Sequence, residues 1–331
     1  MAERNHAEGK IDEVILIDLK NVAYRLHFGN MNLSTTDGRP TSVLHGVMVT
    51  VLKLHKKFPD AAMVFCNDSE KNWRKAHFAD TYKANRTVTE DSRKVNVQVP
   101  ILKDILIKLG FKVVEVEGFE ADDLIGILAS EMSQHYYGYG RALKSVQIVS
   151  NDKDFFQLVS GRIQILRPMP NGKVQRIRTG MDVYRNYFVY PNDWVNYRAL
   201  SGDTSDNIKH ISGIGPKTAV KMLEAGVNPS FEDFGRHPKE VRTRFAQLRD
   251  NWTLVHQSYL LSKIPTRVKW KNYPKGLYLG ELVVELGTIL KNPCREFPKS
   301  IDEMSDEYLN FLCDYELMYL LGRRHEVWRI K

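Results

Sequence analysis

Short apolar runs alternate with amphipathic stretches through the first 160 residues of the chain. The amphipathic stretches repeat their apolar residues at helical spacing, whereas the apolar runs have the length and the flanking turns of buried strands. Strands that alternate with helices predict an α/β fold, in which a mostly parallel central sheet is flanked by helices. Ligands of such sheets bind beyond the carboxyl ends of the strands. The predicted strands are residues 14–17, 61–66, 111–116 and 145–149, and the predicted helices are 42–58, 99–109 and 120–135.

Carboxylates stand where these strands should end. Asp18 follows the first strand and Asp68 the second, while Asp152 and Asp154 follow the fourth. A single aspartate at a strand end is usually a turn or a helix cap, but parallel strands would bring all of these acids to one edge of the sheet. Further acids open the helix after the third strand or follow a later predicted helix: Glu120, Asp122, Asp123, Asp203 and Asp206.

Nine carboxylates at one edge would repel one another unless cations neutralised them. Oxygen ligands without histidine or cysteine favour Mg²⁺ or Mn²⁺ over zinc. Two such ions can activate a water and stabilise the leaving oxygen in phosphodiester cleavage. The acids therefore predict a two-ion site, and we also expect Asp152 and Asp154 to be catalytic.

The rest of the chain is strongly basic. The formal net charge is +8 with the nine acids included, so the remainder carries +17 once they are set aside. A negative site on a positive body suits a protein that holds a phosphate backbone and binds metal ions against it. The three separated cysteines, the polar N-terminus and the lack of a long apolar run predict an intracellular, cytoplasmic protein without a membrane span or a disulfide framework.

Residues 69–96 interrupt the alternating pattern. The stretch is polar and basic, is interleaved with aromatic residues, and is too long for an ordinary connection, which predicts a functional loop or a partly ordered helical insertion. Tyr82 could stack on an unpaired base. A solvated charged loop is the alternative. The basic residues that could contact phosphates are Arg74, Lys75, Lys83, Arg86, Arg93 and Lys94.

The chain after about residue 192 is predicted to be helical and contains a glycine-rich turn. Gly213 and Gly215 permit a close backbone approach, and Pro216 suits a first helical turn. The free amides there, with Lys217 and Thr218, could hold a phosphate without reading bases. A plain turn is the alternative, but flanking apolar residues favour a helix-hairpin-helix of two short packed helices at about 206–225. The other predicted helices are 194–200, 239–248, 251–261 and 306–321.

In combination these segments resemble the 5′-nuclease superfamily, which comprises flap endonucleases and 5′–3′ exonucleases, in the compact single-chain form found in phages. The resemblance covers roughly residues 12–265. One departure is that Leu19 and Lys20 follow Asp18, where the family often has a glycine. The matching segments are 17–18, 67–68, 73–74, 82–86, 120–124, 150–155, 202–208 and 213–217.

The resemblance implies a PIN-like nuclease core over 12–190 with a basic helical arch at about 69–97. It also implies a helical DNA-binding region over 191–265, and it leaves the role of the C-terminal extension, 266–331, unassigned. The metals nearest the scissile phosphate would be held by Asp18, Asp68, Glu120, Asp122, Asp152 and Asp154, and the second position would be completed by Asp123, Asp203 and Asp206. Lys83 and Arg86 would steer the 5′ strand and stabilise charge on the phosphate. The residues expected to contact DNA are Arg74, Tyr82, Lys83, Arg86, Gly213, Gly215, Lys217 and Thr218, with K⁺ at the hairpin in some family members.

The function that we expect is that of a monomeric, Mg²⁺- or Mn²⁺-dependent nuclease. It would cut DNA at 5′ ends, nicks, flaps or junctions and clear primers or flaps during replication. One alternative is an RNase H-like enzyme of the same fold that acts on RNA/DNA hybrids. Another is a non-catalytic DNA-junction binder, although a binder gains nothing from concentrated acids near DNA. The basic stretch and the hairpin argue against a small PIN-type ribonuclease.

Overall fold

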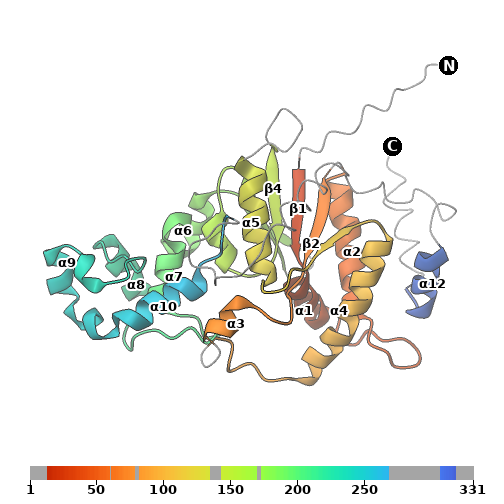
Figure 1. Ribbon diagram of the computed structural model, residues 1–331. Coiled ribbons are helices and arrows are strands. Elements are labelled where there is room, and N and C mark those ends of the chain that lie inside the picture. The colour runs from red at the N-terminus through yellow and green to blue at the C-terminus, as the bar shows by residue number, and fades with distance from the viewer. Residues whose placement is uncertain are drawn as a thin grey trace, which may run out of the picture.

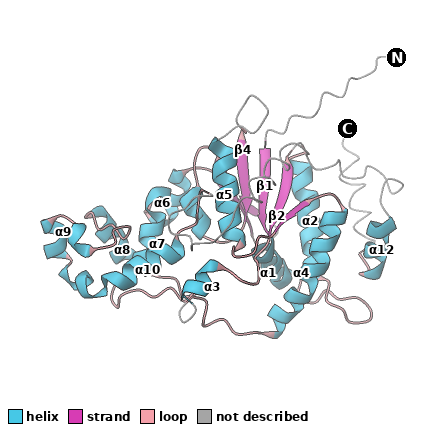
Figure 2. Cartoon of the chain, in the orientation of Figure 1, coloured by secondary structure: helices cyan, strands magenta, loops and turns pink. Residues whose placement is uncertain are grey.

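The computed structural model describes residues 13–59, 61–78, 82–134, 143–169, 173–267 and 306–317. Its centre is a six-stranded sheet in the order β3-β2-β1-β4-β5-β6, in which only the pairing of β5 with β6 is antiparallel (Figures 1 and 2). The predicted mostly parallel sheet flanked by helices is therefore confirmed. The strands are β1 (Glu13–Asp18), β2 (Ala62–Cys66), β3 (Lys112–Val114), β4 (Ser145–Val149), β5 (Ile163–Pro168) and β6 (Val174–Ile177).

The order of the strands creates a crevice between β1 and β4. From β1 the chain adds β2 and then β3 on one side. It then crosses back over the sheet to place β4, and after it β5, on the other side of β1. Ligands of open α/β sheets bind at such a reversal, beyond the carboxyl ends of the strands. Because Ile17 pairs with Val149 across this junction, Asp18 and the residues after β4 emerge at the same edge.

Helices cover both faces of the sheet, as Figure 1 shows. One face packs against α1 (Leu19–Gly29), α2 (Ser42–Lys57) and α4 (Glu90–Lys108), whose apolar sides share a core with Ile15 and Ile17 of β1. The other face packs against α5 (Ala121–Gln134), which shares a core with Val14 and Leu16. The alternation along β1 therefore divides its apolar side chains between two cores.

The chain after the sheet forms a helical arm, which extends to the left in Figure 1. Its α10 packs against α7, and both helices lie near the sheet, whereas α8 and α9 lie farther out. The arm contains α6 (Gly180–Tyr187), α7 (Trp194–Ser201), α8 (Pro216–Glu224), α9 (Lys239–Arg244) and α10 (Trp252–Ser262), with short 3-10 helices η2 (Pro191–Asp193), η3 (Phe234–Arg236) and η4 (Ala246–Asn251).

Of the two short helices expected at 206–225, the structure contains the second. Only α8 lies within that range, and its packing partner is α7, across a connection of turns over 202–215. A bridge between Asp203 and Ile208, and the left-handed backbone of Asn207 (φ 56°), fold the start of this connection into a tight turn. A helix cannot continue through that geometry, which is why the segment before Gly213 is not helical.

The predicted arch consists of a short helix, a turn and the start of a long helix. Helix α3 spans Trp73–Phe78, residues 82–85 form turns, and α4 begins at Glu90, well before the predicted start at 99. Thr89 caps α4 by accepting a hydrogen bond from the Ser92 amide at 3.1 Å. Pro100 lies inside α4 without ending it. This segment lies along the carboxyl edge of the sheet, at the bottom of Figure 1.

Part of the C-terminal extension belongs to the core. Helix α12 (Asp306–Asp314) lies beside α4, and Leu312 and Leu317 are buried in the core that covers the first face of the sheet. The predicted helix at 306–321 is confirmed as far as Asp314, while residues 318–321 lie outside the described part of the chain. None of the helices in the described part is long and apolar enough to cross a bilayer.

Candidate active site

A cleft of about 770 Å³ opens at the carboxyl edge of the sheet, beside the reversal between β1 and β4. It is lined by acids and by basic residues, most of them from the predicted arch, so an anionic chain and a cation could both be held there. The acids are Asp18, Asp68, Glu120, Asp122 and Asp152, and the basic residues are Lys20, Lys75, Lys83 and Arg86.

Asp18 lies at the end of β1, an inner strand that pairs with β2 on one side and β4 on the other. Asp18 caps α1 by accepting from the Asn21 amide (3.3 Å), and accepts from the Ser150 hydroxyl after β4 (2.9 Å). Burial and the negative charges of Asp68 and Asp152 raise the pKa of Asp18 to about 7. A carboxyl group that resists ionisation in the metal-free protein is one that a bound cation would stabilise in its charged form.

A second acidic group lies beside the cleft. Oxygens of Asp154, Asp203 and Asp206 all lie within 4.8 Å of one another, which suits a hard cation. The Asp154 amide donates to Asp152 Oδ1 at 2.8 Å and so joins this group to the cleft. Burial and the charge of Asp152 raise the pKa of Asp154 to about 7. Burial also raises the pKa of Asp152 itself.

Glu120 differs from Asp18, Asp152 and Asp154, because its pKa is lowered. Burial would raise that pKa, but the charges of Lys83 and Arg74 outweigh burial and bring it to about 2. Lys83 Nζ donates to Glu120 Oε1 at 2.7 Å, and the Tyr82 hydroxyl donates to Oε2 at 2.8 Å. Glu120 therefore stays ionised and holds Lys83 at the wall of the cleft.

Arg74 does not have the surface position that a phosphate contact needs. Its side chain is 1% exposed and pairs with Glu120 (3.0 Å), Asp122 (3.3 Å) and Asp123 (2.8 Å), and its Nη2 donates to the Lys263 carbonyl (3.2 Å). The predicted DNA contact is wrong for this structure, because the guanidinium is the internal counter-charge of the acids that open α5. We therefore interpret Arg74 as a positioning residue.

The predicted stacking of Tyr82 needs the same correction. Tyr82 is 4% exposed, with its hydroxyl on Glu120, so its ring is not available to stack on a base. Asp123 is also fully buried: its Oδ1 pairs with Arg74 (2.8 Å), and its Oδ2 accepts from the Trp73 indole (2.9 Å) and the Glu120 amide (3.2 Å). Asp123 thus stabilises the start of α5 beside Glu120 and Asp122, and its part in a metal position stays a prediction.

Lys83 and Arg86 lie between the cleft and the helical arm. Lys83 has a left-handed backbone (φ 55°), its amide donates to the Asp206 carbonyl (2.9 Å), and its ammonium lies on Glu120. Arg86 pairs with the Asp206 carboxylate at 2.6 Å while remaining 58% exposed. The two cations predicted to act on a phosphate are therefore at the boundary of both acidic groups.

Tyr24 is a cleft residue that the sequence did not single out. It lies on α1, one helical turn and a half beyond Asp18, and it lines the cleft with Ser92 and Arg86. Burial raises the pKa of the Tyr24 phenol, so the hydroxyl remains a neutral hydrogen-bonding group. In the sequence, only the helical spacing of Tyr24 from Asp18 could have placed it in the site. That spacing cannot be told apart from the ordinary amphipathic pattern of a helix. Lys20 also lines the cleft, and its Nζ lies 3.8 Å from Asp68.

The glycine-rich turn lies on the arm and is separate from the cleft. Gly213 is left-handed (φ 82°) and a Cβ there would meet open space, so the turn conformation is what requires glycine. Gly215 caps α8, Pro216 occupies its first turn, and Lys217 is exposed. These residues and Thr218 form the N-terminus of α8, and none of them lines the cleft.

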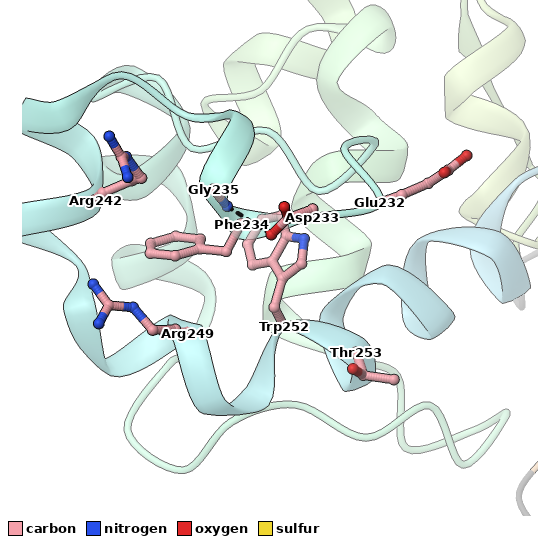
Figure 3. Close-up of a pocket in the computed structure, with 8 residues that line it drawn as sticks. All are labelled: Glu232, Asp233, Phe234, Gly235, Arg242, Arg249, Trp252 and Thr253. Atoms are coloured by element: carbon pink, nitrogen blue, oxygen red, sulfur yellow. Dashed lines mark hydrogen bonds between the residues drawn. The ribbon is translucent and has the colours of Figure 1, made fainter.

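A second hollow, of about 650 Å³, lies at the outer part of the arm (Figure 3). Phe234 and Trp252 line it together with Arg242 and Arg249, and Asp233 holds the Gly235 amide at 2.8 Å. None of the site residues predicted from the sequence lines this hollow. The cleft at the sheet edge is therefore the place where the predicted chemistry could occur.

An acidic cleft at the strand reversal, bordered by cations and followed by a helical arm, defines an α/β nuclease of the metal-dependent class. The family model described as "5′-3′ exonuclease, N-terminal resolvase-like domain" matches residues 13–192, and the one described as "5′-3′ exonuclease, C-terminal SAM fold" matches residues 189–282. The chain belongs to the 5′–3′ exonuclease family.

Curated relatives agree with this family. The chain is 35% identical over 210 residues to a 5′–3′ exonuclease of Aquifex aeolicus, covering 63% of this chain and 68% of that protein. It is 31% identical over 259 residues to one of Buchnera aphidicola, covering 76% and 85%. It is 29% identical over 305 residues to the thermostable DNA polymerase I of Thermus aquaticus, covering 88% of this chain but 34% of the polymerase, so it spans about a third of that relative's length.

Solved structures share the fold at low identity. The T5 5′-exonuclease with bound zinc matches with a TM-score of 0.60 at 18% identity, covering 86% of this chain and 100% of that one. Human GEN1 in complex with Holliday junction DNA matches with a TM-score of 0.51 at 15% identity, covering 88% and 71%. The chain therefore shares its overall fold with these proteins.

Proposed function

We propose that this chain is a structure-specific 5′ nuclease that hydrolyses phosphodiester bonds of DNA at 5′ ends, nicks, flaps or junctions. The observation that carries the proposal is the cleft, in which acids at or just beyond the ends of β1, β2 and β4 lie with Lys83 and Arg86. The relatives named 5′–3′ exonuclease support it. We also propose an intracellular, monomeric protein that clears primers or flaps in replication.

Two divalent cations, Mg²⁺ or Mn²⁺, are the proposed cofactors. Bound there, they would supply an activated water and neutralise charge on the phosphate. Asp154, Asp203 and Asp206 fit a second position, since their oxygens already lie within 4.8 Å of one another and belong to hard ligands only. We leave Asp123 out of both positions because it is fully buried and pairs with Arg74. The first position would be held by Asp18, Asp68, Asp122 and Asp152, with Glu120 in support.

The chain's own cations would position the substrate. Lys83 and Arg86 lie at the boundary of both acidic groups, where they could hold the scissile phosphate and stabilise its developing charge. The amides before α8, with Lys217 and Thr218, could hold the duplex backbone, with K⁺ at that turn. The family matches meet at 189–192, which supports a nuclease core over 12–190 and a DNA-binding region over 191–265.

A panel of end-labelled substrates tests this function. Flap, nicked, gapped, blunt and RNA-primed duplexes are incubated with the chain in Mg²⁺, in Mn²⁺ and in excess EDTA. We expect release of short 5′ products from the DNA flap or nick in metal only. Faster release from the RNA primer would favour the RNase H-like alternative. Tight binding without cleavage in either metal would leave a junction-binding protein.

Tyr24 should stack on an unpaired nucleotide, in place of the buried Tyr82. Tyr24→Ala should lower cleavage of a substrate with an unpaired 5′ nucleotide about tenfold, since base–aromatic stacking is worth about 1–3 kcal/mol. Tyr24→Phe should retain the activity because the ring remains. The measurement is kcat/KM on a flap substrate. Equal losses in the alanine and phenylalanine variants would show that the hydroxyl, rather than the ring, is what matters.

The raised pKa values of Asp18 and Asp154 predict a pH dependence of the metal-free protein. Both are near 7 in the folded chain and near 3.8 when unfolded, so the folded state binds more protons between these values. Stability in EDTA should therefore fall as the pH rises from about 4 to about 7. Because a cation must displace those protons, the rise in Tm produced by Ca²⁺ should be larger at about pH 8 than at about pH 6. An equal rise at both values would contradict this.

A further inference from the structure

Two arginines, one on α7 and one in the predicted arch, pair with the carboxylates of the Asp154–Asp203–Asp206 group. Arg198 of α7 donates from Nε to Asp154 Oδ1 at 2.8 Å and pairs through Nη2 with Asp203. Its Nη1 also donates to the Gly202 carbonyl at 3.3 Å. The Arg198 side chain is 13% exposed and has three contacts, so its position is fixed. It joins η1 (Asp154–Leu158) of the sheet domain to the connection after α7.

The second arginine is held differently. Arg86 reaches Asp206 from the predicted arch with a single ion pair, and its side chain is 58% exposed. The same arch segment contacts the 203–208 turn through two weaker, neutral links, from the Lys83 amide to the Asp206 carbonyl and from the Asn85 side chain to the Thr204 carbonyl at 3.0 Å. Arg86 can therefore leave Asp206 without disturbing a buried contact.

Resting on the function proposed above, we infer that Arg198 and Arg86 set the cation affinity of this group. When a cation is bound and all three carboxylates are ionised, they carry a formal charge of −3, and the two guanidiniums reduce it to −1. A divalent cation binds a group of charge −1 more weakly than one of charge −2, because both arginines repel it. Arg198 is the permanent counter-charge, and Arg86 is the one that leaves when a substrate phosphate takes its place.

Because Arg86 belongs to the arch, its departure from Asp206 couples cation binding to the attachment of the arch to the 203–208 turn. A phosphate that attracts Arg86 away from Asp206 raises the affinity of the group for its cation, and by linkage a bound cation weakens the attachment of the arch to the 203–208 turn. The second cation position would thus be filled mainly when substrate is present, which restrains cleavage until the 5′ strand is in place.

The test measures Mn²⁺ binding to the DNA-free protein by calorimetry, so that it does not depend on turnover. Asp203→Asn identifies the binding step that belongs to this group. Arg86→Gln should tighten that step about two- to fivefold, the range for an exposed ion pair. Arg198→Gln should tighten it further, whereas Arg198→Lys, which retains the charge, should stay near wild type. Arg185→Gln, which removes an exposed pair with Asp182 on α6, is the matched control.

Amide hydrogen exchange of residues 82–89 gives the second readout. Saturating Ca²⁺ should speed exchange there in the wild type and have little effect in Arg86→Gln, where the attachment is already weakened. Unchanged or weaker Mn²⁺ binding in both glutamine variants, with wild-type melting, would overturn the counter-charge role and leave the cation position intact. If the wild type lacks an Asp203-dependent step, the cation position of the proposed function fails instead.

Discussion

Asp152→Asn should reduce cleavage of a 5′ flap by more than about a hundredfold, since even the partners of metal ligands are typically worth 10–100-fold. Asp152 lies in the cleft, its charge raises the pKa of Asp18, and its Oδ1 accepts from the Asp154 amide. It is therefore shared between the two acidic groups. The amide has nearly the same shape but no charge, so it removes the electrostatic attraction for a cation and leaves the packing in place. The measurement is single-turnover cleavage in Mg²⁺ and Mn²⁺.

The control for this variant is Asp104→Asn, which removes an acid from an exposed pair with Lys108 on α4. It should cleave at the wild-type rate. Asp152→Asn should also melt at or above the wild-type temperature in EDTA, because it relieves repulsion among buried acids. An Asp152→Asn protein that cleaves within a few-fold of wild type in both metals would show that the cleft acids are not the catalytic centre.

The acids of the cleft could be predicted because parallel strands impose their own geometry. Asp18, Asp68 and Asp152 each follow a strand, and the pairing of β1 with both β2 and β4 leaves no choice about the edge at which they meet. No knowledge of side-chain conformation was needed. The order of the strands was not predicted, because helical crossovers between parallel strands are compatible with more than one order.

The roles of Arg74 and Tyr82 could not be predicted, because they depend on which way a short helix turns. Both lie in a stretch without core periodicity, where a basic residue looks like a solvent-facing one. The structure turns them inward onto Glu120, so that the charge of α5 is balanced internally. Arg198 was missed for the opposite reason, because it lies in an ordinary helical pattern and only the fold places Asp154 beside it.

The inward position of Arg74 leads to the largest stability effect that we expect. Arg74→Met should lower the free energy of unfolding by about 3–5 kcal/mol, the usual effect of removing one partner from a buried ion pair. The variant retains the apolar stem but leaves Glu120, Asp122 and Asp123 without their shared counter-charge. Burial already raises the pKa of Asp122 and Asp123, so these acids would take up protons. The measurement is urea unfolding in EDTA at about pH 7.5.

Arg86→Gln is the matched comparison, because Arg86 also pairs with an acid of the site but is largely exposed. Its stability should change by less than about 1 kcal/mol. A DNA-contacting Arg74 would give the reverse pattern for Arg74→Met, with weaker DNA binding at unchanged stability. Loss of stability with cleavage partly recovered at low temperature, where the variant remains folded, would instead show that Arg74 acts on the substrate only through the acids that it positions.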